Sequence, residues 1–294
     1  MDAISLTSCA KVNFGLRVVR RRPDGFHDIQ TILQTIDLGD KLDISLVSGG
    51  RIQVRCDHPE VPSGPENLAH RAAEMLQREF QVEHGCRIQI AKKIPPAAGL
   101  GGGSSNAAAA LTGLNRLWGL NLSQEVLLDL AARLGSDVPF FLEGGTALAE
   151  GRGERLRPIP LLAEFWLVVI KPDFSIATKW VYQQIKIPLT SNLLDVKLKS
   201  LKEISNLDQL LGFLQNDLER AVQKAYPSIG DIKTELLSKG AMGAAMSGSG
   251  SSVFGLVRTR EDAEKLAERV SCAKWQIFVV RPVRRCEGPG QLDH

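Results

Sequence analysis

The residues most suited to chemistry stand at 95–111, where PPAAGLGGGSSNAAAAL places glycine and serine directly before a run of alanine. Glycine lets the backbone approach a ligand closely, because no side chain shields its N–H group. The Ala- and Leu-rich stretch 106–117 predicts a helix that ends before Gly119. Its beginning can be capped by Ser104, Ser105 or Asn106. Since a helix N-terminus carries about half a positive charge, the stretch predicts a phosphate-binding loop, with a flexible turn as the alternative.

Two common phosphate-binding motifs do not match this loop. A P-loop requires Lys followed by Ser or Thr after its last glycine, and here Ser104-Ser105-Asn106 follows. The dinucleotide pattern G-x-G-x-x-G fails because Ser104 stands in place of its third glycine. The loop therefore indicates a third way of holding phosphate.

Candidate side chains for catalysis lie in two other segments. Alternating polar and apolar residues in KVNFGLRVV, at 11–19, predict a strand with Lys11 and Asn13 on one face. The alternative is that both side chains face solvent. Asp137, in LGSDVPFFL, follows the glycine expected to end a helix, so it is either a cap or turn residue or a catalytic carboxylate.

Two further loops are candidates for ligand contact. Pro23-Asp24-Gly25 predicts a turn, and the arginines at 20–22 either solvate that turn or steer an anionic ligand. His27, beside Phe26, suits a structural hydrogen bond as well as a ligand contact. The cluster MSGSGSS at 246–252 is either a simple turn or a second loop of backbone donors for a phosphorylated ligand.

Strands and helices must position these loops, and apolar residues recur along the chain with the spacing of both. Alternation predicts strands at KVNFGLRVV, KLDISL, RIQVRC and RIQIA. Helical patterns cover about 67–80, 105–118 and 123–134, the last with Ser123 as its cap. The stretch 142–160 is rich in Gly, Pro and Arg, and it predicts a strand pair and a crossing between two domains. We expect the first domain to cover residues 1–158 and the second to cover residues 159–294.

The second half of the chain opens with a predicted strand at 166–171. A Lys-rich stretch at 186–203 follows and is expected to be exposed. The chain then ends in a strand–helix–strand pattern from 251 onward. The order of elements predicts an α+β fold with mixed sheets.

The composition is that of a soluble globular protein, with 44% hydrophobic and 23% charged residues among 294. A net charge of +3 gives no support to a nucleic-acid or membrane partner, and FWLVVI is too short to cross a bilayer. The N-terminal sequence has no signal-peptide pattern. Five widely spaced cysteines without C-x-x-C argue against a disulfide framework or zinc site, and favour a reducing cytoplasm.

Together these motifs resemble the superfamily of galactose, homoserine, mevalonate and phosphomevalonate kinases. Its phosphate loop, P-x-x-x-G-L-G-x-S-S-x, is similar to residues 95–106. The opening AKVNFGLRVVRRRPDGFHD resembles A-K-x-N-x-x-L…R-x-D-G-Y-H, the pattern of a branch that acts on a cytidine diphosphate-linked alcohol. PENLAHRAA, LGSDVPFFLEGGTALAEGRGE, KPDFSIATKWVY and SGSGSSVF match that branch in order. Phe26 departs from it, since the branch has Tyr there, so ring stacking is kept but any hydroxyl hydrogen bond is lost.

The resemblance implies an ATP-dependent small-molecule kinase, with Mg²⁺ expected beside ATP. It implies a two-domain fold, with an N-terminal ATP-binding domain, a ferredoxin-like C-terminal domain and the active site between them. A sister kinase for homoserine or a mevalonate-type acid, and a nucleotide-binding regulator without catalysis, are the alternatives. The R-x-D-G-[YF]-H opening argues against the first, and the presence of both Lys11 and Asp137 argues against the second.

The resemblance also implies roles for individual residues. Lys11 and Asp137 fall at the positions of the catalytic pair. Nucleotide-binding positions are Asn67, Lys92, Pro95, Ala97, Ala98, Gly99, Leu100, Gly101, Gly102, Gly103, Ser104, Ser105 and Asn106. Positions on the side of the cytidine diphosphate substrate are Asn13, Phe26, His27, Tyr182, Gly248 and Ser249. The Ser105 hydroxyl is a candidate Mg²⁺ ligand, and neither the remaining ligands nor an oligomeric state is assigned.

Overall fold

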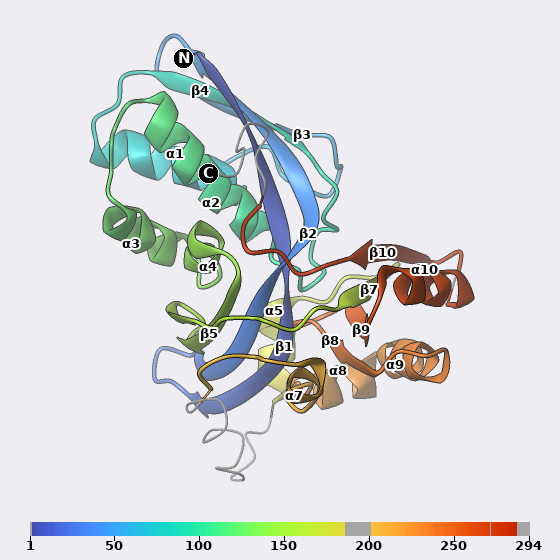
Figure 1. The fold of residues 1–294 in the computed structure, drawn as a ribbon. Coiled ribbons are helices and arrows are strands. Elements are labelled where there is room, and N and C mark those ends of the chain that lie inside the picture. Colours follow the sequence, from blue (N-terminus) through green and yellow to red (C-terminus); the bar gives the residue numbers. More distant parts are fainter. Residues whose placement is uncertain (1, 186–200, 271, 287–294) are drawn as a thin grey trace.

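The computed structural model describes residues 2–185, 201–270 and 272–286, which form two β-sheets with helices packed on them (Figure 1). In the first sheet the order is β3-β4-β2-β5-β6, and β1 pairs with β2. Its strands are β1 (Ala3–Arg21), β2 (His27–Val47), β3 (Ile52–Cys56), β4 (Gly85–Ala91), β5 (Thr146–Gly151) and β6 (Arg155–Pro158). The helices of this half are α1 (Leu68–Glu79), α2 (Gly102–Leu117), α3 (Gln124–Leu134) and α4 (Val138–Glu143).

The second sheet has four antiparallel strands in the order β10-β7-β9-β8. They are β7 (Trp166–Pro172), β8 (Gly243–Met246), β9 (Val253–Val257) and β10 (Trp275–Val280). The helices of this half are α5 (Thr178–Gln184), α7 (Leu207–Leu211), α8 (Glu219–Ala225), α9 (Ser228–Ser238) and α10 (Arg260–Arg269). The strand–helix–strand ending predicted from the sequence is confirmed by β9, α10 and β10. The mixed α+β fold is confirmed as well.

A long antiparallel hairpin of β1 and β2 forms the spine of the molecule, with its register running from Ala3 opposite Ser45 to Arg21 opposite His27. β4 pairs with residues 41–47 of β2 and β5 pairs with residues 29–34. The two ends of the hairpin therefore lie in different surroundings. One end carries β4 and the helices, and the other lies against the second half of the chain (Figure 1).

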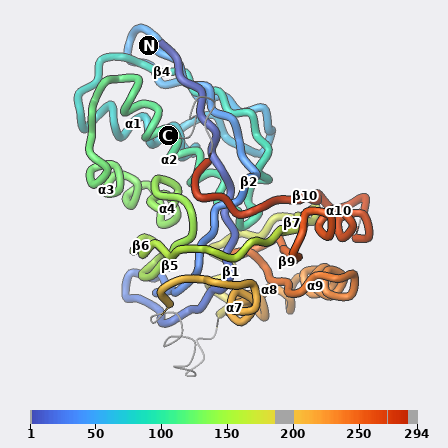
Figure 2. Tube along the Cα trace, in the orientation of Figure 1, coloured from blue at the N-terminus to red at the C-terminus, as the bar shows by residue number. Residues whose placement is uncertain are grey.

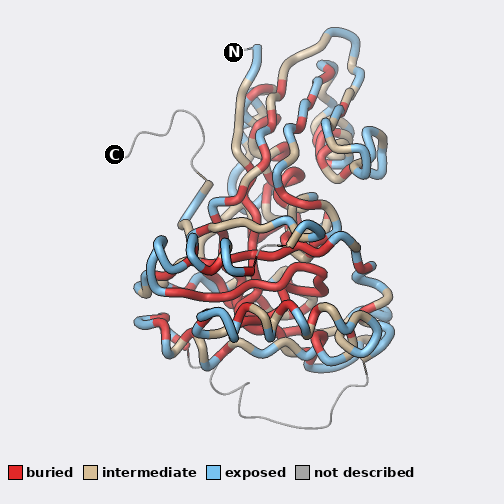
Figure 3. Tube along the Cα trace, turned by 90° about the vertical axis from the view of Figure 1, so that its right-hand side faces the viewer, coloured by how far each residue is buried: buried red, intermediate tan, exposed pale blue. Residues whose placement is uncertain are grey.

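Three large apolar clusters and a smaller one around Phe140 hold this arrangement together, and Figure 3 shows buried residues running along the strands of both sheets. Leu42, Ile44 and Ile88 pack under helices α1 to α3. Phe14 of β1 contacts the rings of Phe165 and Phe254, with centroids 5.6 and 5.9 Å apart, and thereby joins the two sheets. A third cluster packs α8, α9 and α10 on the second sheet. Burial of such side chains is the main favourable term in folding.

The predicted strands of the first half are confirmed, and so is the helix from 124 with Ser123 as its cap, whose Oγ accepts from Val126 N. The strand pair predicted within 142–160 is confirmed as β5 and β6. The Lys-rich stretch expected to be exposed lies outside the described residues up to 200. At its described end Lys202 and Glu203 are exposed as expected, whereas Leu201 is buried, so the prediction is wrong for Leu201 alone. None of the helices in the described ranges combines the length and apolar character needed to cross a membrane.

The capping prediction for α2 is wrong. The helix begins at Gly102, and its N-cap is Gly101 in the left-handed region at φ +72°, with no side-chain cap hydrogen bond. Ser104, Ser105 and Asn106 therefore lie inside the first turns rather than before them. Because a left-handed backbone is strained for residues with a Cβ, the chain turns into the helix at a glycine instead.

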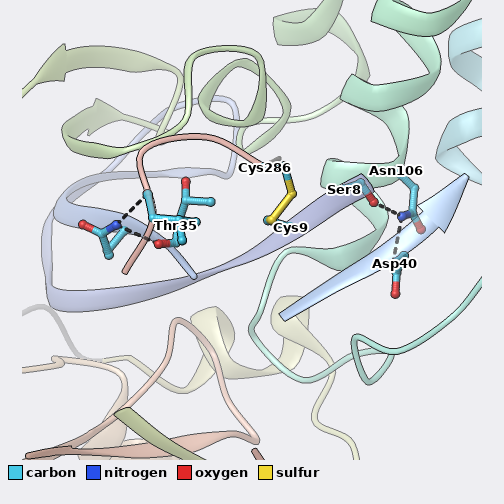
Figure 4. Close-up of a disulfide and its surroundings, with 8 residues drawn as sticks. Ser8, Cys9, Thr35, Asp40, Asn106 and Cys286 are labelled. Carbon is cyan, nitrogen blue, oxygen red and sulfur yellow. Dashed lines mark hydrogen bonds between the residues drawn. A yellow bond between two sulfur atoms is a disulfide. The ribbon is translucent and has the colours of Figure 1, made fainter. Parts of the chain in front are cut away.

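The argument against disulfides is also wrong for one pair of cysteines. After β10 the chain runs back across the first sheet (Figure 2), where Val283 N donates to Thr35 O at 2.9 Å. Cys286, on this returning segment, forms a disulfide with Cys9 of β1, and their Cα atoms are 5.6 Å apart (Figure 4). The two cysteines are 277 residues apart in sequence, and only the fold brings them together.

Candidate active site

The glycine loop before α2 is held between β1 and the loop at 247–252. Lys11 N donates to Leu100 O at 3.0 Å, and Ser252 N donates to Ala98 O at 3.1 Å. Ala97 adopts φ +49°, an uncommon value for a residue with a side chain. Ala97 is exposed, whereas Pro95, Ala98 and Leu100 are buried, so the loop reaches solvent at Ala97 and returns to the interior before the helix.

The N-terminus of α2 presents backbone donors without a side chain to receive them. The first N–H groups of a helix have no acceptor within the helix, and here these belong to Gly102, Gly103 and Ser104. Ser105 N already donates to Gly101 O. A Cβ on Gly101 would lie 2.6 Å from the Phe141 ring, so a glycine is needed there for packing as well as for its backbone angle. The predicted phosphate-binding geometry is therefore present in the backbone.

Lys11 and Asp137 lie beside this helix terminus, although 126 positions separate them in the sequence. Lys11 Nζ lies 3.7 Å from Asp137 Oδ2, and the two side chains are 5% and 35% exposed, respectively. Lys11 Nζ donates to Asn13 Oδ1 at 2.6 Å and to Gly99 O at 2.9 Å. Burial lowers the pKa of Lys11, while the Asp137 charge acts in the opposite direction.

Asp137 stands at the N-cap position of α4, yet its side chain makes no cap hydrogen bond. The cap interpretation, the commoner role of an Asp before a helix, therefore does not account for this carboxylate. It remains directed at Lys11 and partly open to solvent. A half-exposed carboxylate paired with a buried ammonium group is suited to accepting a proton from a bound hydroxyl.

Asn13 links the pair to β2 and to the second loop. Its Nδ2 donates to Thr31 Oγ1 at 2.9 Å, and Thr31 Oγ1 donates to Gly15 O. A Cβ on Gly248 would lie 3.1 Å from Asn13 Oδ1 and 3.2 Å from Lys11 Nζ. The glycine at 248 thus lets the backbone of the second loop approach Lys11 and Asn13 closely.

The two glycine–serine loops, separated by about 150 positions in the sequence, contact each other directly. Ser247 Oγ donates to Gly99 O at 3.0 Å, and Asn216 Nδ2 donates to Gly248 O at 2.8 Å. Ser249 Oγ and Thr178 Oγ1 are 2.9 Å apart and share a hydrogen bond. The second loop is therefore more than an isolated turn, since it closes one side of the Lys11 site.

Aromatic side chains lie on the other side of this site. The rings of His27 and Tyr182 stack with centroids 5.2 Å apart. Burial, followed by the positive charge of Arg21, lowers the pKa of His27. Burial, followed by the charge of Asp137, raises the pKa of Tyr182. Phe26 remains 54% exposed and does not join this stack.

The residues expected on the nucleotide side take part in buried hydrogen bonds and ion pairs. Lys92 Nζ pairs with Asp40 Oδ2. Asn106 Nδ2 donates to Asp40 Oδ2 at 2.8 Å and to Ser8 Oγ at 2.6 Å, next to the disulfide in Figure 4. Asn67 caps α1, where its Oδ1 accepts from Ala69 N at 2.9 Å. Lys92 and Asn67 flank the glycine loop. A Cβ on Gly102 would lie 2.8 Å from Lys92 Nζ, and a Cβ on Gly103 would lie 3.8 Å from Leu68, which follows Asn67.

Sequence reasoning missed several residues that shape the site, namely Thr31, Asp40, Phe141, Arg152, Thr178 and Asn216. Asp40 is fully buried, and its Oδ1 accepts from Lys93 N and Ile94 N, both at 2.8 Å. Asp40 directly follows Gly39 and precedes a strand pattern, which is the usual place of a turn residue. Only its burial reveals that it anchors the loop that precedes the phosphate site.

Few side chains of the described residues are available to bind the Mg²⁺ expected beside ATP. Within residues 2–185, 201–270 and 272–286, no three or more His, Cys, Asp or Glu side chains form a group that could hold a metal ion. Ser105 is 2% exposed and borders a cavity of about 370 Å³, which Cys9, Thr35 and Phe141 also line. A metal at this site would therefore depend mainly on oxygen atoms of the nucleotide.

Comparison with known proteins agrees with this geometry. Residues 67–145 match the GHMP kinases N terminal domain, and residues 192–277 match the GHMP kinases C terminal model. A 4-diphosphocytidyl-2-C-methyl-D-erythritol kinase of Geobacter sulfurreducens is 45% identical over 283 residues, which cover 96% of this chain and 100% of the relative. A protein of the same name from Acetivibrio thermocellus is 41% identical, with 96% and 100% covered.

Two solved structures extend the comparison to the fold. A crystal structure of 4-(cytidine 5'-diphospho)-2C-methyl-D-erythritol kinase superposes with a TM-score of 0.77 at 34% identity, covering 95% of this chain and 98% of that one. A homoserine kinase from Cytophaga hutchinsonii also gives 0.77, but at 19% identity, with 98% and 96% covered. The second likeness concerns the fold alone.

Proposed function

The chain belongs to the 4-diphosphocytidyl-2-C-methyl-D-erythritol kinases within the GHMP kinases, and from this premise we propose how it transfers the γ-phosphate of ATP to the 2-hydroxyl of that substrate. The reaction phosphorylates an intermediate of isoprenoid biosynthesis. One observation carries the assignment of residues: Lys11 and Asp137 lie 3.7 Å apart beside the bare N-terminus of α2.

Asp137 accepts the proton of the attacking hydroxyl. A carboxylate is a weak base toward an alcohol, but phosphoryl transfer passes through a loose transition state, so the proton can leave after the new bond has begun to form. General-base assistance of this kind contributes roughly 10² to 10⁴ in rate. The half-exposed carboxylate can reach a substrate without losing its partner Lys11.

Lys11 stabilises negative charge at the reacting centre. Its hydrogen-bond acceptors, Asn13 Oδ1 and Gly99 O, are neutral, and Asp137 is its one ion-pair partner within the described part of the chain. Desolvation makes such a charge more effective than one in water. Lys11 is therefore placed to attract the γ-phosphate toward the hydroxyl that Asp137 faces.

The backbone of 101–105 binds the phosphates of ATP. The unpaired N–H groups of Gly102, Gly103 and Ser104 are donors for the β-phosphate, where charge accumulates as the γ-phosphoryl group leaves. Asn67 and Lys92 flank the loop on the side assigned to the adenine. These groups are held in place before the nucleotide arrives, so little reorganisation is needed.

We infer that ATP enters as its magnesium complex. The described side chains offer no metal cage, which suits an ion that keeps several waters and is held chiefly by phosphate oxygens. When bound, Mg²⁺ supplies positive charge to the β- and γ-phosphates. The Ser105 hydroxyl is the candidate oxygen ligand that this chain would contribute. Ser105 is assigned this role through its position in the first turn of α2, although its side chain is buried.

The cytidine end of the substrate binds at the aromatic side of the site. Phe26 and Tyr182 offer ring faces, His27 offers a neutral imidazole, and Asn13, Gly248 and Ser249 border the path toward Lys11. Base stacking on an aromatic ring contributes about 1–3 kcal/mol. Phe26 keeps that contribution where relatives of this branch carry Tyr.

The test is ATP consumption by the purified protein with and without 4-diphosphocytidyl-2-C-methyl-D-erythritol, beside mevalonate and homoserine. We expect consumption to depend on the cytidine substrate. Activity with mevalonate or homoserine instead would support a sister kinase, and ATP binding without turnover on any alcohol would support a regulator.

Two broader assignments accompany this function. We propose the division into 1–158 and 159–294, because β6 ends at Pro158 and the second sheet begins with β7. The returning segment 281–286 nevertheless packs on the first sheet, so the second unit reaches back to the first. We also propose a cytoplasmic location and a small-molecule substrate, with neither nucleic acid nor membrane as a partner, and this proposal rests on the metabolic reaction rather than on the cysteines.

A further inference from the structure

We propose that Arg152 binds the diphosphate of the substrate and thereby selects for an acceptor alcohol that carries one. This inference rests on the proposed function, since it uses the order of groups in the cytidine substrate. That order places the diphosphate between the base and the carbon skeleton that bears the reacting hydroxyl. A residue that lies between the sites for the two ends is therefore placed to meet the diphosphate.

One side of Arg152 adjoins the catalytic carboxylate. Arg152 lies in the turn from β5 to β6, between Gly151 at φ +71° and Gly153 at φ +118°. A Cβ on Gly153 would lie 3.7 Å from Asp137 Oδ1. The backbone of the turn thus passes within contact distance of the group that faces the reacting hydroxyl.

The other side of Arg152 adjoins the aromatic region. Its Cζ lies 5.3 Å from the centroid of the Phe26 ring, a cation–π contact. Phe26 is 54% exposed, so this ring has surface left for a ligand. The guanidinium group is thus held at the edge of the base-binding region, and the same short turn reaches Asp137.

The charge of Arg152 is less neutralised than that of its neighbours. Arg20 and Arg22 both pair with Asp28, at 2.5 and 3.0 Å. Arg152 Nε lies 3.9 Å from Glu154 Oε2, beyond hydrogen-bond distance, and its side chain is 33% exposed. Glu154 Oε2 instead accepts from the backbone N of Arg152, at 2.7 Å. Arg20 and Arg22 are therefore occupied, whereas the guanidinium of Arg152 keeps donors for a ligand.

Guanidinium chemistry fits a diphosphate. Its planar fork donates two parallel hydrogen bonds to phosphate oxygens, and such charge-assisted bonds are about twice as strong as neutral ones. Stacking on Phe26 orients the fork before the substrate binds, which reduces the entropy lost on binding. A cytidine diphosphate group would then touch Phe26 with its base and Arg152 with its phosphates.

The experiment compares binding of cytidine and of cytidine diphosphate to the full chain, with Arg152→Gln as the variant. We expect the variant to bind cytidine diphosphate about 10- to 100-fold more weakly, while cytidine binding changes by less than about 2-fold. The KM for ATP should stay within about 2-fold, because the nucleotide loop is not touched. Arg260→Gln is the matched control, since Arg260 makes the same kind of contact with Trp166, at 5.7 Å, far from the site.

Equal loss for both ligands would overturn the proposal, because it would mean that Arg152 only supports Phe26. No loss for either ligand, or a loss matched by Arg260→Gln, would overturn it as well. These binding measurements need no turnover. A wild-type protein that fails to consume ATP with the cytidine substrate would refute the proposed function itself, so the two failures are distinguishable.

Discussion

The nucleotide side and the substrate side of the site are built in opposite ways. On the nucleotide side, Asp40 is fully buried and its oxygens accept hydrogen bonds from Asn106 and two backbone amides, while Lys92 pairs with it. On the substrate side, Phe26 is more than half exposed and the ring of His27 stacks on that of Tyr182. The side chains around the nucleotide loop are engaged in buried internal bonds, whereas the ring of Phe26 on the substrate side lies open to solvent.

The difference follows from the ligands. Every ATP molecule brings the same phosphates, so a fixed set of backbone donors serves it well, and rigidity costs no specificity. An alcohol substrate must be told apart from other alcohols, and side chains that remain partly unpaired are free to do so. Changes on the nucleotide side should therefore affect stability, and changes on the substrate side should affect KM.

The largest effect is expected where the two sides meet. Asp137→Asn removes the base, and Lys11→Met removes the charge that supports it. Each variant should lower kcat by roughly 10² to 10⁴, while ATP affinity measured by calorimetry changes only a few-fold. Either variant with near-normal turnover would remove that residue from the mechanism.

A smaller but still large effect is expected from Asp40→Asn. The change leaves the buried Lys92 ammonium without its counter-charge, which costs about 3–5 kcal/mol of the free energy of unfolding. Denaturant titration measures this loss. The matched control is Asp43→Asn, because Asp43 pairs with Lys41 at 3.0 Å on the surface, and its loss should be no more than about 1 kcal/mol. Similar losses in both variants would contradict the comparison between the two sides.

Phe26→Ala should act on the substrate and hardly on the fold. Loss of one stacking surface should raise the KM for the cytidine substrate about 10-fold. The free energy of unfolding should change by less than about 0.5 kcal/mol, because the ring is largely exposed. Phe26→Tyr is the control that keeps the ring, and its KM should remain near the wild-type value. A stability loss without a change in KM would show that the ring is structural.

The smallest effect concerns His27. Its pKa in the folded protein lies below the ordinary value of 6.5, first because of burial and then because of Arg21. The folded state therefore binds this proton less readily than the unfolded state. The resulting stability is present above pH 6.5 and is lost as the pH falls through the lowered pKa. NMR titration of the imidazole should give a midpoint below 6.5, and Arg21→Gln should raise it; a midpoint at or above 6.5 would contradict the assignment.

Local patterns in the sequence predicted those parts of the fold that depend on local rules. The strand at 11–19 and the helix at 124–134 follow from period and capping alone, since Ser123 and Gly135 mark the helix ends. The six-residue helix α4 was missed because it is too short for a period to be seen and has Pro139 near its start. The capping prediction failed because either a serine or a glycine can stand before a helix. At position 101 the Phe141 ring leaves no room for a Cβ, so a glycine occupies the N-cap.

For the site, the sequence and the family resemblance together named candidate residues, and the structure shows how these residues lie relative to one another. Lys11, Asp137 and both glycine loops were identified, and the structure brings them into contact. Asp40 and Arg152 were missed because their importance lies in burial in one case and in position between two subsites in the other. The pairing of Cys9 with Cys286 was missed for the same reason, since no local rule connects residues at opposite ends of a chain.

The Cys9–Cys286 bond turns nearly the whole polypeptide into one covalent ring, with only the first eight and last eight residues outside it. A single protease cut at any exposed point of that ring opens it without releasing a fragment. The nicked protein would therefore migrate as one species in a denaturing gel, and two pieces would separate only after a thiol reductant is added.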